Sequence, residues 1–232
     1  MTDLTNKVAV VTGGNSGIGF ATAKEFKARG ATVIITGRNA ERLDKAATEL
    51  GVKAVLADQS KLEDLDNLVQ QVSSTVGKVD ILFVNAGVLL PTPLGQLSEA
   101  AFDDTMNINF KGAVFTVEKF LPHLNDGASI INLSSISAYL GMATTAVYAG
   151  SKAALNAFTR TAATELAPRK IRVNSVNPGP VVTEIFGKTG MPEDQLEGFA
   201  QAMQQRIPLK EYGSPEAIAK LVAYLASDDA WF

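Results

Sequence analysis

The sequence contains no cysteine and only one histidine, His123. The absence of cysteine excludes disulfides and thiolate chemistry, and it is typical of proteins from a reducing cytoplasm. Transition metals prefer thiolate and imidazole ligands, so a chain with a single histidine is not expected to hold a dedicated metal site. We therefore expect a cytoplasmic location and no metal.

The sequence also lacks a cluster of basic residues and a long apolar segment. Its formal net charge of −3 argues against nucleic acid or an anionic membrane surface as a partner. The N-terminal stretch MTDLTNKVAV has neither the basic nor the apolar region of a signal peptide. No apolar run approaches the roughly 20 residues that span a bilayer. We expect neither nucleic acid nor a membrane among its partners.

The chain contains enough apolar material for a sizeable core, because 46% of its 232 residues are hydrophobic and 19% are charged. Short, near-continuously apolar runs alternate with amphipathic stretches from one end to the other. The apolar runs predict strands over 7–12, 32–36, 52–57, 80–85, 129–134 and 171–177. The amphipathic stretches include 18–29, 40–50 and 61–76. Such strands are typical of a parallel sheet covered on both faces, so residues 1–232 are predicted to form a single α/β domain with a doubly wound, Rossmann-like sheet.

Two stretches carry helix-start signals. Ser60 and Glu63 have the spacing of a capping box for the helix over 61–76. The run Ser214, Pro215 and Glu216 is typical of an N-cap, a first helical residue and a favourably placed acid.

A glycine-rich turn, TGGNSGIGF, follows the first predicted strand directly. Gly13, Gly17 and Gly19 lie between that strand and the first helix, where glycine lets backbone N–H groups approach a pyrophosphate at the helix N-terminus. An ordinary βα loop can also be rich in glycine, but the strand–turn–helix context favours a dinucleotide site. The spacing is G-x-x-x-G-x-G rather than the common G-x-G-x-x-G.

The tip of the second predicted strand bears on which dinucleotide is bound. Gly37 and Arg38 stand there, with no acidic residue at the tip. An NAD site usually places Asp or Glu at this point to hold the ribose 2′-hydroxyl, whereas an arginine suits a 2′-phosphate. Most arginines are solvated loop cations, but this position favours a phosphate clamp. NADP(H) is therefore expected.

Tyr148 and Lys152 lie four residues apart in AVYAGSKAAL, which reads as the start of a helix. Residues at this spacing share one helix face. The pair can be a surface feature of no consequence or a proton donor beside a fixed positive charge. Its spacing alone does not decide between them, because it occurs by chance in many helices.

Six motifs in one order settle the question by resemblance. They are TGGNSGIG (12–19), VNAG (84–87), NINFKG (107–112), NLSS (132–135), YAGSK (148–152) and NPGPVVTE (177–184). Over nearly its whole length the chain resembles the short-chain dehydrogenase/reductase family, most of all bacterial NADP-dependent secondary alcohol dehydrogenases and ketoreductases.

The resemblance implies four catalytic residues: Asn109, Ser135, Tyr148 and Lys152. Tyr148 matches the acid/base, and the Lys152 ammonium is expected to lower the pKa of its phenol toward working pH. Ser135 matches the serine that holds the substrate oxygen. Asn109 matches an asparagine that interrupts a helix and sustains a water relay.

Local rivals and simpler roles exist for these residues. Ser134 and Ser137 compete with Ser135, and Tyr139 is a second phenol without a lysine four residues later. Capping or turn formation is the alternative role of Ser135 and Asn109.

The resemblance also implies contacts to the cofactor. Asp58 matches a contact to the adenine amino group, although a helix-capping role is equally open to it. The Val181 backbone and the Thr183 side chain match contacts to the nicotinamide carboxamide. The full expected set is Gly13, Asn15, Ser16, Gly17, Ile18, Gly19, Arg38, Asp58, Asn85, Ala86, Gly87, Tyr148, Lys152, Pro178, Gly179, Val181 and Thr183.

One departure from the family pattern concerns the end of the chain. The family follows LASDDA (225–230) with a last strand, whereas this sequence ends at WF. We therefore expect the seventh strand of the family to be missing.

The predicted function is hydride transfer between NADP(H) and a ketone or secondary alcohol. The loops 87–94, 138–143 and 183–187 are apolar, with Lys188 the only basic residue nearby, which favours aryl or medium-sized aliphatic substrates. A 3-oxoacyl-thioester reductase is an alternative, but no basic cluster for an acidic carrier flanks 88–97 or 183–205. A non-catalytic dinucleotide-binding sensor or scaffold is the other.

A homo-oligomer, dimer or tetramer, is expected through the helices over about 99–121 and 148–166. These helices carry more apolar residues than one face against the sheet requires. The residues are Ala113, Val114, Phe115, Val117, Phe120, Ala153, Ala154, Ala157 and Phe158.

Overall fold

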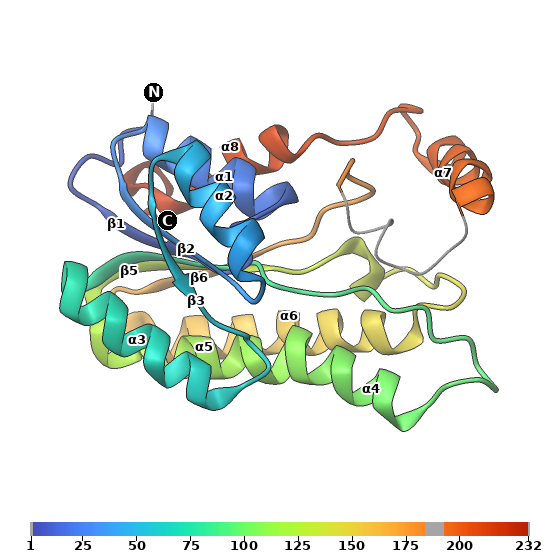
Figure 1. Cartoon of the computed structure of the whole chain (residues 1–232), viewed down its shortest axis with the longest axis horizontal. Helices are drawn as coiled ribbons and strands as arrows, with labels where there is room; N and C mark the ends of the chain where they lie inside the picture. The colour runs from blue at the N-terminus through green and yellow to red at the C-terminus, as the bar shows by residue number, and fades with distance from the viewer. Residues whose placement is uncertain (1, 184–192, 232) are drawn as a thin grey trace.

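The computed structural model describes residues 2–183 and 193–231 and contains one parallel sheet of six strands (Figure 1). The strands are β1 (Val8–Val11), β2 (Thr32–Gly37), β3 (Lys53–Leu56), β4 (Val79–Val84), β5 (Leu124–Leu133) and β6 (Arg172–Val176). Their order in the sheet is β3-β2-β1-β4-β5-β6, and every neighbouring pair is parallel. The Rossmann-like prediction is confirmed, and all six strands were located, although β5 begins at Leu124 rather than at 129.

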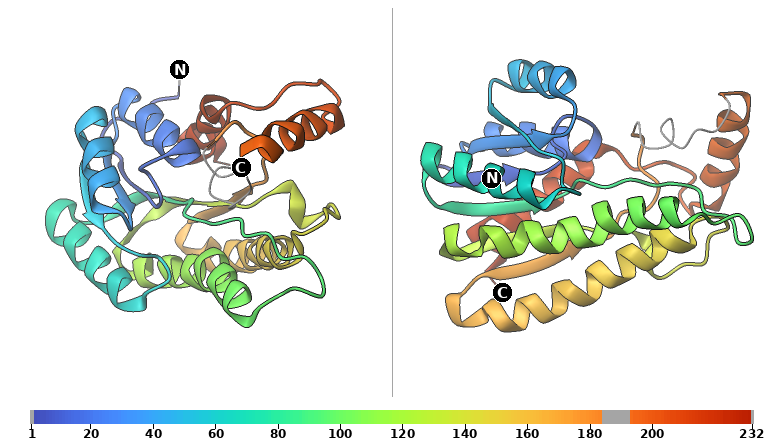
Figure 2. Two further views of the ribbon diagram at one scale, coloured as in Figure 1. Left: turned by 45° about the vertical axis from the view of Figure 1, so that its right-hand side comes forward. Right: turned by 60° about the horizontal axis from the view of Figure 1, so that its bottom comes forward.

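Helices cover both faces of the sheet (Figures 1 and 2). On one face lie α1 (Gly17–Ala28), α2 (Ala40–Leu50) and α8 (Pro215–Ala226); on the other lie α3 (Leu62–Val76), α5 (Ala113–Phe120) and α6 (Ala146–Leu166). The structure also describes two further α-helices, α4 (Glu99–Met106) and α7 (Glu193–Arg206).

The alternation of side chains along each strand explains the near-continuous apolar runs. In β4, Ile81 and Phe83 pack into the core under α1 and α8, while Leu82 and Val84 pack into the core against α3 and α5. All four are at most 2% exposed. Because successive side chains of a strand point to opposite faces, a sheet covered on both sides requires apolar residues at every position.

The long helix predicted over 99–121 is interrupted in the structure. Between α4 and α5, residues Asn107–Gly112 form a π-helical turn. Gly112 suits this turn because a Cβ on it would lie 2.3 Å from the carbonyl oxygen of Gln59. Such turns are rare and occur mostly at functional sites, and this one contains Asn109, in agreement with the expected interruption.

One of the two predicted helix starts is wrong. The first residue of α3 is Leu62, its N-cap residue is Lys61, and no side-chain cap bond is made. Ser60 lies one residue before the N-cap, and its hydroxyl donates to Oδ1 of Asp58 at 2.7 Å. The second start is confirmed: Ser214 is the N-cap of α8 and its hydroxyl accepts a bond from the Ala217 N–H at 3.1 Å.

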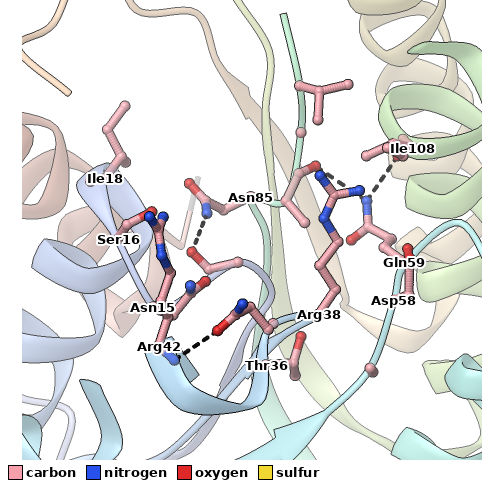
Figure 3. Close-up of a pocket in the computed structure, with 18 of the residues that line it drawn as sticks. Asn15, Ser16, Ile18, Thr36, Arg38, Arg42, Asp58, Gln59, Asn85 and Ile108 are labelled. Carbon is pink, nitrogen blue, oxygen red and sulfur yellow. Dashed lines mark hydrogen bonds between the residues drawn. The ribbon is translucent and has the colours of Figure 1, made fainter. Parts of the chain in front are cut away.

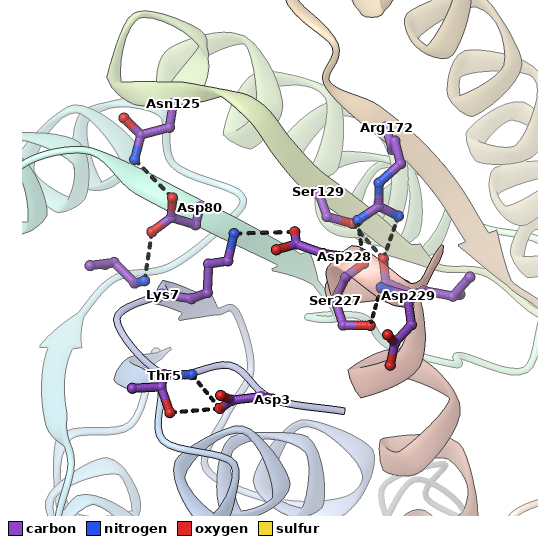
Figure 4. Close-up of polar contacts among 12 residues, drawn as sticks. Asp3, Thr5, Lys7, Asp80, Asn125, Ser129, Arg172, Ser227, Asp228 and Asp229 are labelled. Carbon is purple, nitrogen blue, oxygen red and sulfur yellow. Dashed lines mark hydrogen bonds and ion pairs between the residues drawn. The ribbon is translucent and has the colours of Figure 1, made fainter. Parts of the chain in front are cut away.

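Polar contacts tie the amino ends of the strands together (Figure 4). The Asp80 carboxylate of β4 accepts bonds from the Val8 N–H of β1 and the Asn125 amide of β5, both at 2.8 Å. On β6, the Arg172 guanidinium donates to the carbonyl oxygen of Leu225 at the end of α8, at 2.6 Å. These groups satisfy one another, so this edge of the sheet is structural.

The residues behind the oligomer prediction divide between the core and the surface. Phe120 is fully buried, whereas Phe115 is 36% exposed and Ala153 and Ala157 of α6 are exposed. An apolar face on α5 and α6 is therefore present, and assembly through it stays a prediction. Within the described residues, no helix is both long and apolar enough to cross a membrane.

Phe120 and Phe115 provide a matched pair for testing the core. Phe120→Ala should lower the free energy of unfolding by about 3–5 kcal/mol, because truncation leaves a cavity beneath the sheet. Phe115→Ala on the same helix should change it much less. Urea denaturation of both variants measures this, and equal losses would contradict the assignment of Phe120 to the core.

Candidate active site

Two adjoining cavities lie at the carboxyl ends of the strands. The larger measures about 400 Å³ and is lined by the loops that follow β1, β2, β3 and β4. The smaller measures about 120 Å³ and is lined by the segments after β5 and β6, the start of α6, and Met203 of α7. Ile18, Leu133 and Thr183 line both cavities, so the two meet at these residues.

Several glycine positions of the turn after β1 leave no room for a side chain. A Cβ on Gly19 would lie 2.2 Å from the carbonyl oxygen of Gly13. Gly13 and Gly17 have φ values of +63° and +54°, in the left-handed region that favours glycine. The turn can therefore bring its backbone to the wall of the larger cavity, as the predicted phosphate-binding role requires.

Asn85, in the loop after β4, braces this turn. Its side-chain amide donates to the carbonyl oxygens of Thr12 and Gly13 at 2.8 and 3.1 Å. In return, the Thr12 hydroxyl accepts bonds from the backbone N–H groups of Asn85 and Ala86, both at 3.0 Å. These four bonds fix the loops after β1 and β4 relative to each other.

The walls of the larger cavity suit a nicotinamide dinucleotide. The N-terminus of α1 borders it, and the N-cap residue Ser16 makes no side-chain cap bond, so the backbone N–H groups there are available to an anion. Arg38 lines the cavity at the tip of β2 and is exposed, and Arg42 of α2 lines it as well (Figure 3). No signal in the sequence indicated Arg42, which lies in the first turn of α2, four residues after Arg38.

Asp58 forms a local turn in the contacts observed and does not cap α3, whose N-cap residue is Lys61. Its Oδ1 accepts bonds from the Ser60 backbone N–H and hydroxyl at 3.0 and 2.7 Å. Its carboxylate also lines the larger cavity. The contact to adenine therefore stays a prediction.

The structure distributes the remaining expected cofactor residues between the cavities. The larger cavity is lined by Gly13, Asn15, Ser16, Gly17, Ile18, Arg38, Asp58, Asn85, Ala86, Gly87 and Thr183. The smaller is lined by Ile18, Ser135, Tyr148, Pro178, Gly179, Val181 and Thr183. Gly19 is buried beneath the turn, and Asn109 and Lys152 are 1% and 4% exposed behind the walls.

The side chains of Tyr148 and Ser135 both line the smaller cavity. Both residues are 8% exposed. Ser135 Oγ accepts a bond from the Ser137 N–H at 3.1 Å and donates to Ser137 Oγ at 3.2 Å. Both sequence-predicted side chains are thus placed where a substrate oxygen could reach them.

Lys152 lies one helical turn beyond Tyr148 and is deeply buried. Its Nζ donates to the carbonyl oxygen of Leu133 at 2.7 Å and lies 5.9 Å from the centroid of the Tyr148 ring. Burial lowers the pKa of Lys152 to about 8, because the ammonium form loses its hydration.

The expected effect on Tyr148 is not what the structure shows. Burial is the largest influence and raises the pKa of its phenol, while the nearby Ser135 side chain acts in the opposite direction. We expected the Lys152 charge to lower this pKa, but the loss of hydration prevails in the protein alone. Tyr148 is therefore protonated at neutral pH, the state a proton donor requires.

Asn109 links the loop after β4 to helix α6. Its Oδ1 accepts the Val88 N–H and its Nδ2 donates to the Val88 carbonyl oxygen, both at 2.8 Å. The same Nδ2 donates to Ser151 Oγ at 3.2 Å, and Ser151 donates to the carbonyl oxygen of Tyr148 at 2.7 Å. Sequence reasoning missed Ser151, which stands beside Lys152 in the YAGSK motif.

Thr92, also missed, holds the start of α6. Its backbone N–H donates to the carbonyl oxygen of Thr144 at 2.6 Å, and its Oγ1 accepts the Val147 N–H at 3.5 Å. Thr144 has a φ of +65°, which is strained for a β-branched residue. No local signal marks Thr92, because its partners lie more than fifty residues away in the sequence.

Two of the three rivals are held in other contacts, whereas Ser137 lines the smaller cavity beside Ser135. Ser134 donates to the carbonyl oxygen of Lys152 at 3.1 Å. Tyr139 is 69% exposed, and its hydroxyl accepts a bond from Asn156. These contacts favour Ser135 and Tyr148 as the reactive hydroxyl groups.

The smaller cavity is largely apolar. Leu89, Ile136, Met142, Val181 and Met203 contribute to its walls. The loop 183–187 and Lys188, which entered the substrate prediction, lie outside the described residues apart from Thr183. Among the described residues, no group of three or more His, Cys, Asp or Glu side chains could hold a metal ion.

Comparison with known proteins identifies the family. The family model described as Enoyl-(Acyl carrier protein) reductase matches residues 13–232. The chain is 40% identical to oxidoreductase asL5 of Sarocladium schorii, covering 99% of this chain and 92% of that protein. It is 34% identical to hydroxynaphthalene reductase arp2 of Aspergillus fumigatus, with coverages of 98% and 88%.

A solved structure gives the same picture. The crystal structure of a blue fluorescent protein from a metagenomic library, in complex with NADPH, superposes with a TM-score of 0.90 at 33% identity, covering 99% of this chain and 94% of that one. The chain therefore belongs to the short-chain dehydrogenase/reductase family and is an oxidoreductase of that family.

The pKa of Lys152 predicts a pH-dependent stability. Its pKa of about 8 in the folded protein lies below the usual lysine value of 10.5. Above pH 8 the unfolded chain therefore binds more protons than the folded chain. This group therefore makes the protein more stable as pH rises, by up to about 1.4 kcal/mol per pH unit. Lys152→Met removes the contribution. Urea denaturation between pH 7.5 and 9.5 should show a steeper rise in wild type, and parallel profiles would contradict the burial of the ammonium.

Proposed function

We propose that this protein interconverts ketones and secondary alcohols using NADP(H). The observation that carries the proposal is the placement of the Tyr148 and Ser135 hydroxyl groups. Both side chains line a small, largely apolar cavity, which shares the lining residues Ile18, Leu133 and Thr183 with the dinucleotide cavity. A carbonyl group at this junction has two hydroxyl donors on one side and the dinucleotide cavity on the other.

The proposed catalytic residues are Asn109, Ser135, Tyr148 and Lys152. Ser135 and Tyr148 bind the carbonyl oxygen, and Tyr148 transfers its phenolic proton to that oxygen as the carbonyl is reduced. When bound, NADP(H) supplies the hydride chemistry that amino-acid side chains lack. Lys152 stabilises the phenolate that Tyr148 leaves behind, and Asn109 holds the loop after β4 at Val88.

The walls of the larger cavity support a preference for NADP(H). Gly37 and Arg38 stand at the tip of β2, and Arg42 of α2 also lines the cavity. Two guanidinium groups suit a 2′-phosphate, and no acidic side chain stands at the tip for a 2′-hydroxyl. The NADPH complex of the blue fluorescent protein supports the same preference.

The apolar walls of the smaller cavity support aryl or medium-sized aliphatic substrates. Leu89, Met142 and Met203 offer flexible apolar surface. The hydroxynaphthalene reductase among the relatives is named for an aromatic substrate. We also propose a homo-oligomer through the exposed face that contains Phe115, Ala153 and Ala157.

Absorbance at 340 nm tests the proposal most simply. The purified protein should oxidise NADPH with aryl or aliphatic ketones and give a higher kcat/KM for them than for keto acids, sugars or acyl thioesters. A higher kcat/KM for acyl thioesters would favour the thioester reductase. Dinucleotide binding without turnover of any of these substrates would favour the non-catalytic sensor or scaffold.

Tyr148→Phe should keep NADPH binding and lose kcat by roughly 10²- to 10⁴-fold, because only the proton donor is removed. The expected result is this loss in kcat together with an unchanged Kd of NADPH, measured by fluorescence titration. A kcat close to that of wild type would overturn the assignment of Tyr148.

Arg38→Ala should weaken NADPH by roughly tenfold to a hundredfold, since charge-assisted bonds to a phosphate contribute about 1.5–3 kcal/mol. NADH lacks the 2′-phosphate and serves as the control, so its Kd should change little. Equal losses for both dinucleotides would show that Arg38 does not contact the 2′-phosphate.

A further inference from the structure

Gln59, in the loop after β3, joins three segments of the larger cavity. The residue is 6% exposed. Its Nε2 donates to the carbonyl oxygen of Ala86 at 3.2 Å and to that of Ile108 at 3.0 Å. Figure 3 shows both bonds leaving the same amide nitrogen, one toward the loop after β4 and one toward the π-helical turn.

These contacts determine the orientation of the amide. Rotating it by 180° would place Oε1 against two carbonyl oxygens and remove both bonds. In the observed orientation Oε1 is buried and has no partner among the described residues. An unpaired buried acceptor is unfavourable, so an apolar side chain would be the better choice if Gln59 only filled space.

The two carbonyl groups belong to segments with roles at the site. Ala86 follows Asn85, which braces the glycine turn. Ile108 precedes Asn109, whose amide binds Val88 in the same loop. Gln59 thus contacts the residues next to both amides.

The π-helical turn also packs closely on Gln59. A Cβ on Gly112 would lie 2.3 Å from the Gln59 carbonyl oxygen and 2.9 Å from its Cγ. The turn therefore meets Gln59 at both of its ends, at Ile108 through a hydrogen bond and at Gly112 through van der Waals contact. An α-helical turn with an ordinary side chain at 112 could not approach so closely.

We propose that Gln59 is a positioning residue. Its two hydrogen bonds fix the π-helical turn relative to the loop after β4, and they thereby hold Asn109 and the Ala86 wall of the dinucleotide cavity in place. The inference rests on the proposed function, because it assigns Gln59 to the binding and turnover of NADP(H). Gln59 acts through Ala86 and Ile108 and does not itself need to touch the substrate.

The requirement for two donors on one nitrogen separates glutamine from its close relatives. Methionine matches the length of the side chain but donates no hydrogen bond. Glutamate presents only acceptors while ionised, and burial beside two carbonyl oxygens would raise the pKa of its carboxyl group. Once protonated, it regains a single donor.

Three measurements on Gln59→Met and Gln59→Glu test the proposal: the Kd of NADPH by fluorescence titration, kcat and KM for a ketone, and the midpoint of thermal unfolding. Gln59→Met should raise the Kd of NADPH and lower kcat, each by about tenfold, while KM for the ketone stays unchanged. The KM is expected to hold because Gln59 does not line the smaller cavity. Gln70→Met and Gln70→Glu, at an exposed glutamine of α3, are the controls.

The pH dependence of NADPH affinity in Gln59→Glu distinguishes a positioning role from a merely structural one. Between pH 8 and 6 its NADPH affinity should recover by about tenfold relative to wild type as the carboxyl group takes up its proton, whereas the ratio for Gln59→Met should stay constant. Unchanged NADPH affinity and kcat in Gln59→Met, or a pH profile of Gln59→Glu parallel to wild type, would overturn the proposal.

The binding readout separates this inference from the proposed function. If wild type binds NADPH but reduces no ketone, the proposed reaction fails while the Kd values still decide the role of Gln59. If wild type binds no dinucleotide, both fail. A fall in the thermal midpoint without any change in Kd or kcat would show that Gln59 stabilises the fold and does not position the site.

Discussion

The reversal of strand order between β1 and β4 is the constraint on which the site depends. From β1 the chain crosses one face of the sheet to β2, and from β4 it crosses the other face to β5. The loops after β1 and β4 therefore diverge, and a crevice opens at the carboxyl ends of these two neighbouring strands. Both cavities of the structure lie at this edge, while the opposite edge is closed by its own polar contacts (Figure 4).

Close packing keeps the crevice rigid. A side chain on Gly13 would meet Asn85 and Ala86 of the loop after β4, and one on Gly19 would meet the Gly13 carbonyl oxygen. Asn85 bonds the turn to the loop after β4. Asn109 continues the connection from Val88 to α6 through Ser151. The bonds of Asn85 and those of Asn109 and Ser151, joined by the backbone between Asn85 and Val88, connect the proposed phosphate site to Tyr148. Groups held in this way are preorganised for their task.

Burial determines the electrostatics of the reactive groups. Lys152 is buried and donates a hydrogen bond to the carbonyl oxygen of Leu133, and the pKa of its ammonium falls to about 8. The phenol of Tyr148 is buried as well, and its pKa rises. In the protein alone both groups are thus displaced toward their neutral forms, so the phenol holds its proton ready for a developing alkoxide.

Much of this arrangement could be predicted from the sequence. The six apolar runs predicted the sheet, because a parallel sheet covered on both faces needs apolar residues at successive positions. The glycine turn was predicted from a local signal, the freedom of its backbone. Helical spacing placed Tyr148 and Lys152 on one helix face, and the resemblance to the family assigned their role. The resemblance to the family added Ser135 and Asn109, which local patterns would have assigned to turns.

The remainder depends on contacts between distant segments. Gln59 and Arg42 line the larger cavity because separate loops converge there, and neither shows a local signal. The capping box at Ser60 failed because α3 begins one residue later, with Lys61 as its N-cap residue. The expected shift in the pKa of Tyr148 had the wrong sign because spacing reveals a neighbouring charge but does not reveal burial.

A crystal structure of the protein with NADPH tests the central claim most directly. The account predicts the 2′-phosphate beside Arg38 and Arg42, the pyrophosphate at the glycine turn, and the nicotinamide where the two cavities meet at Ile18, Leu133 and Thr183. The nicotinamide should face the hydroxyl groups of Ser135 and Tyr148. A nicotinamide bound away from these hydroxyl groups, or a 2′-phosphate remote from Arg38, would contradict it.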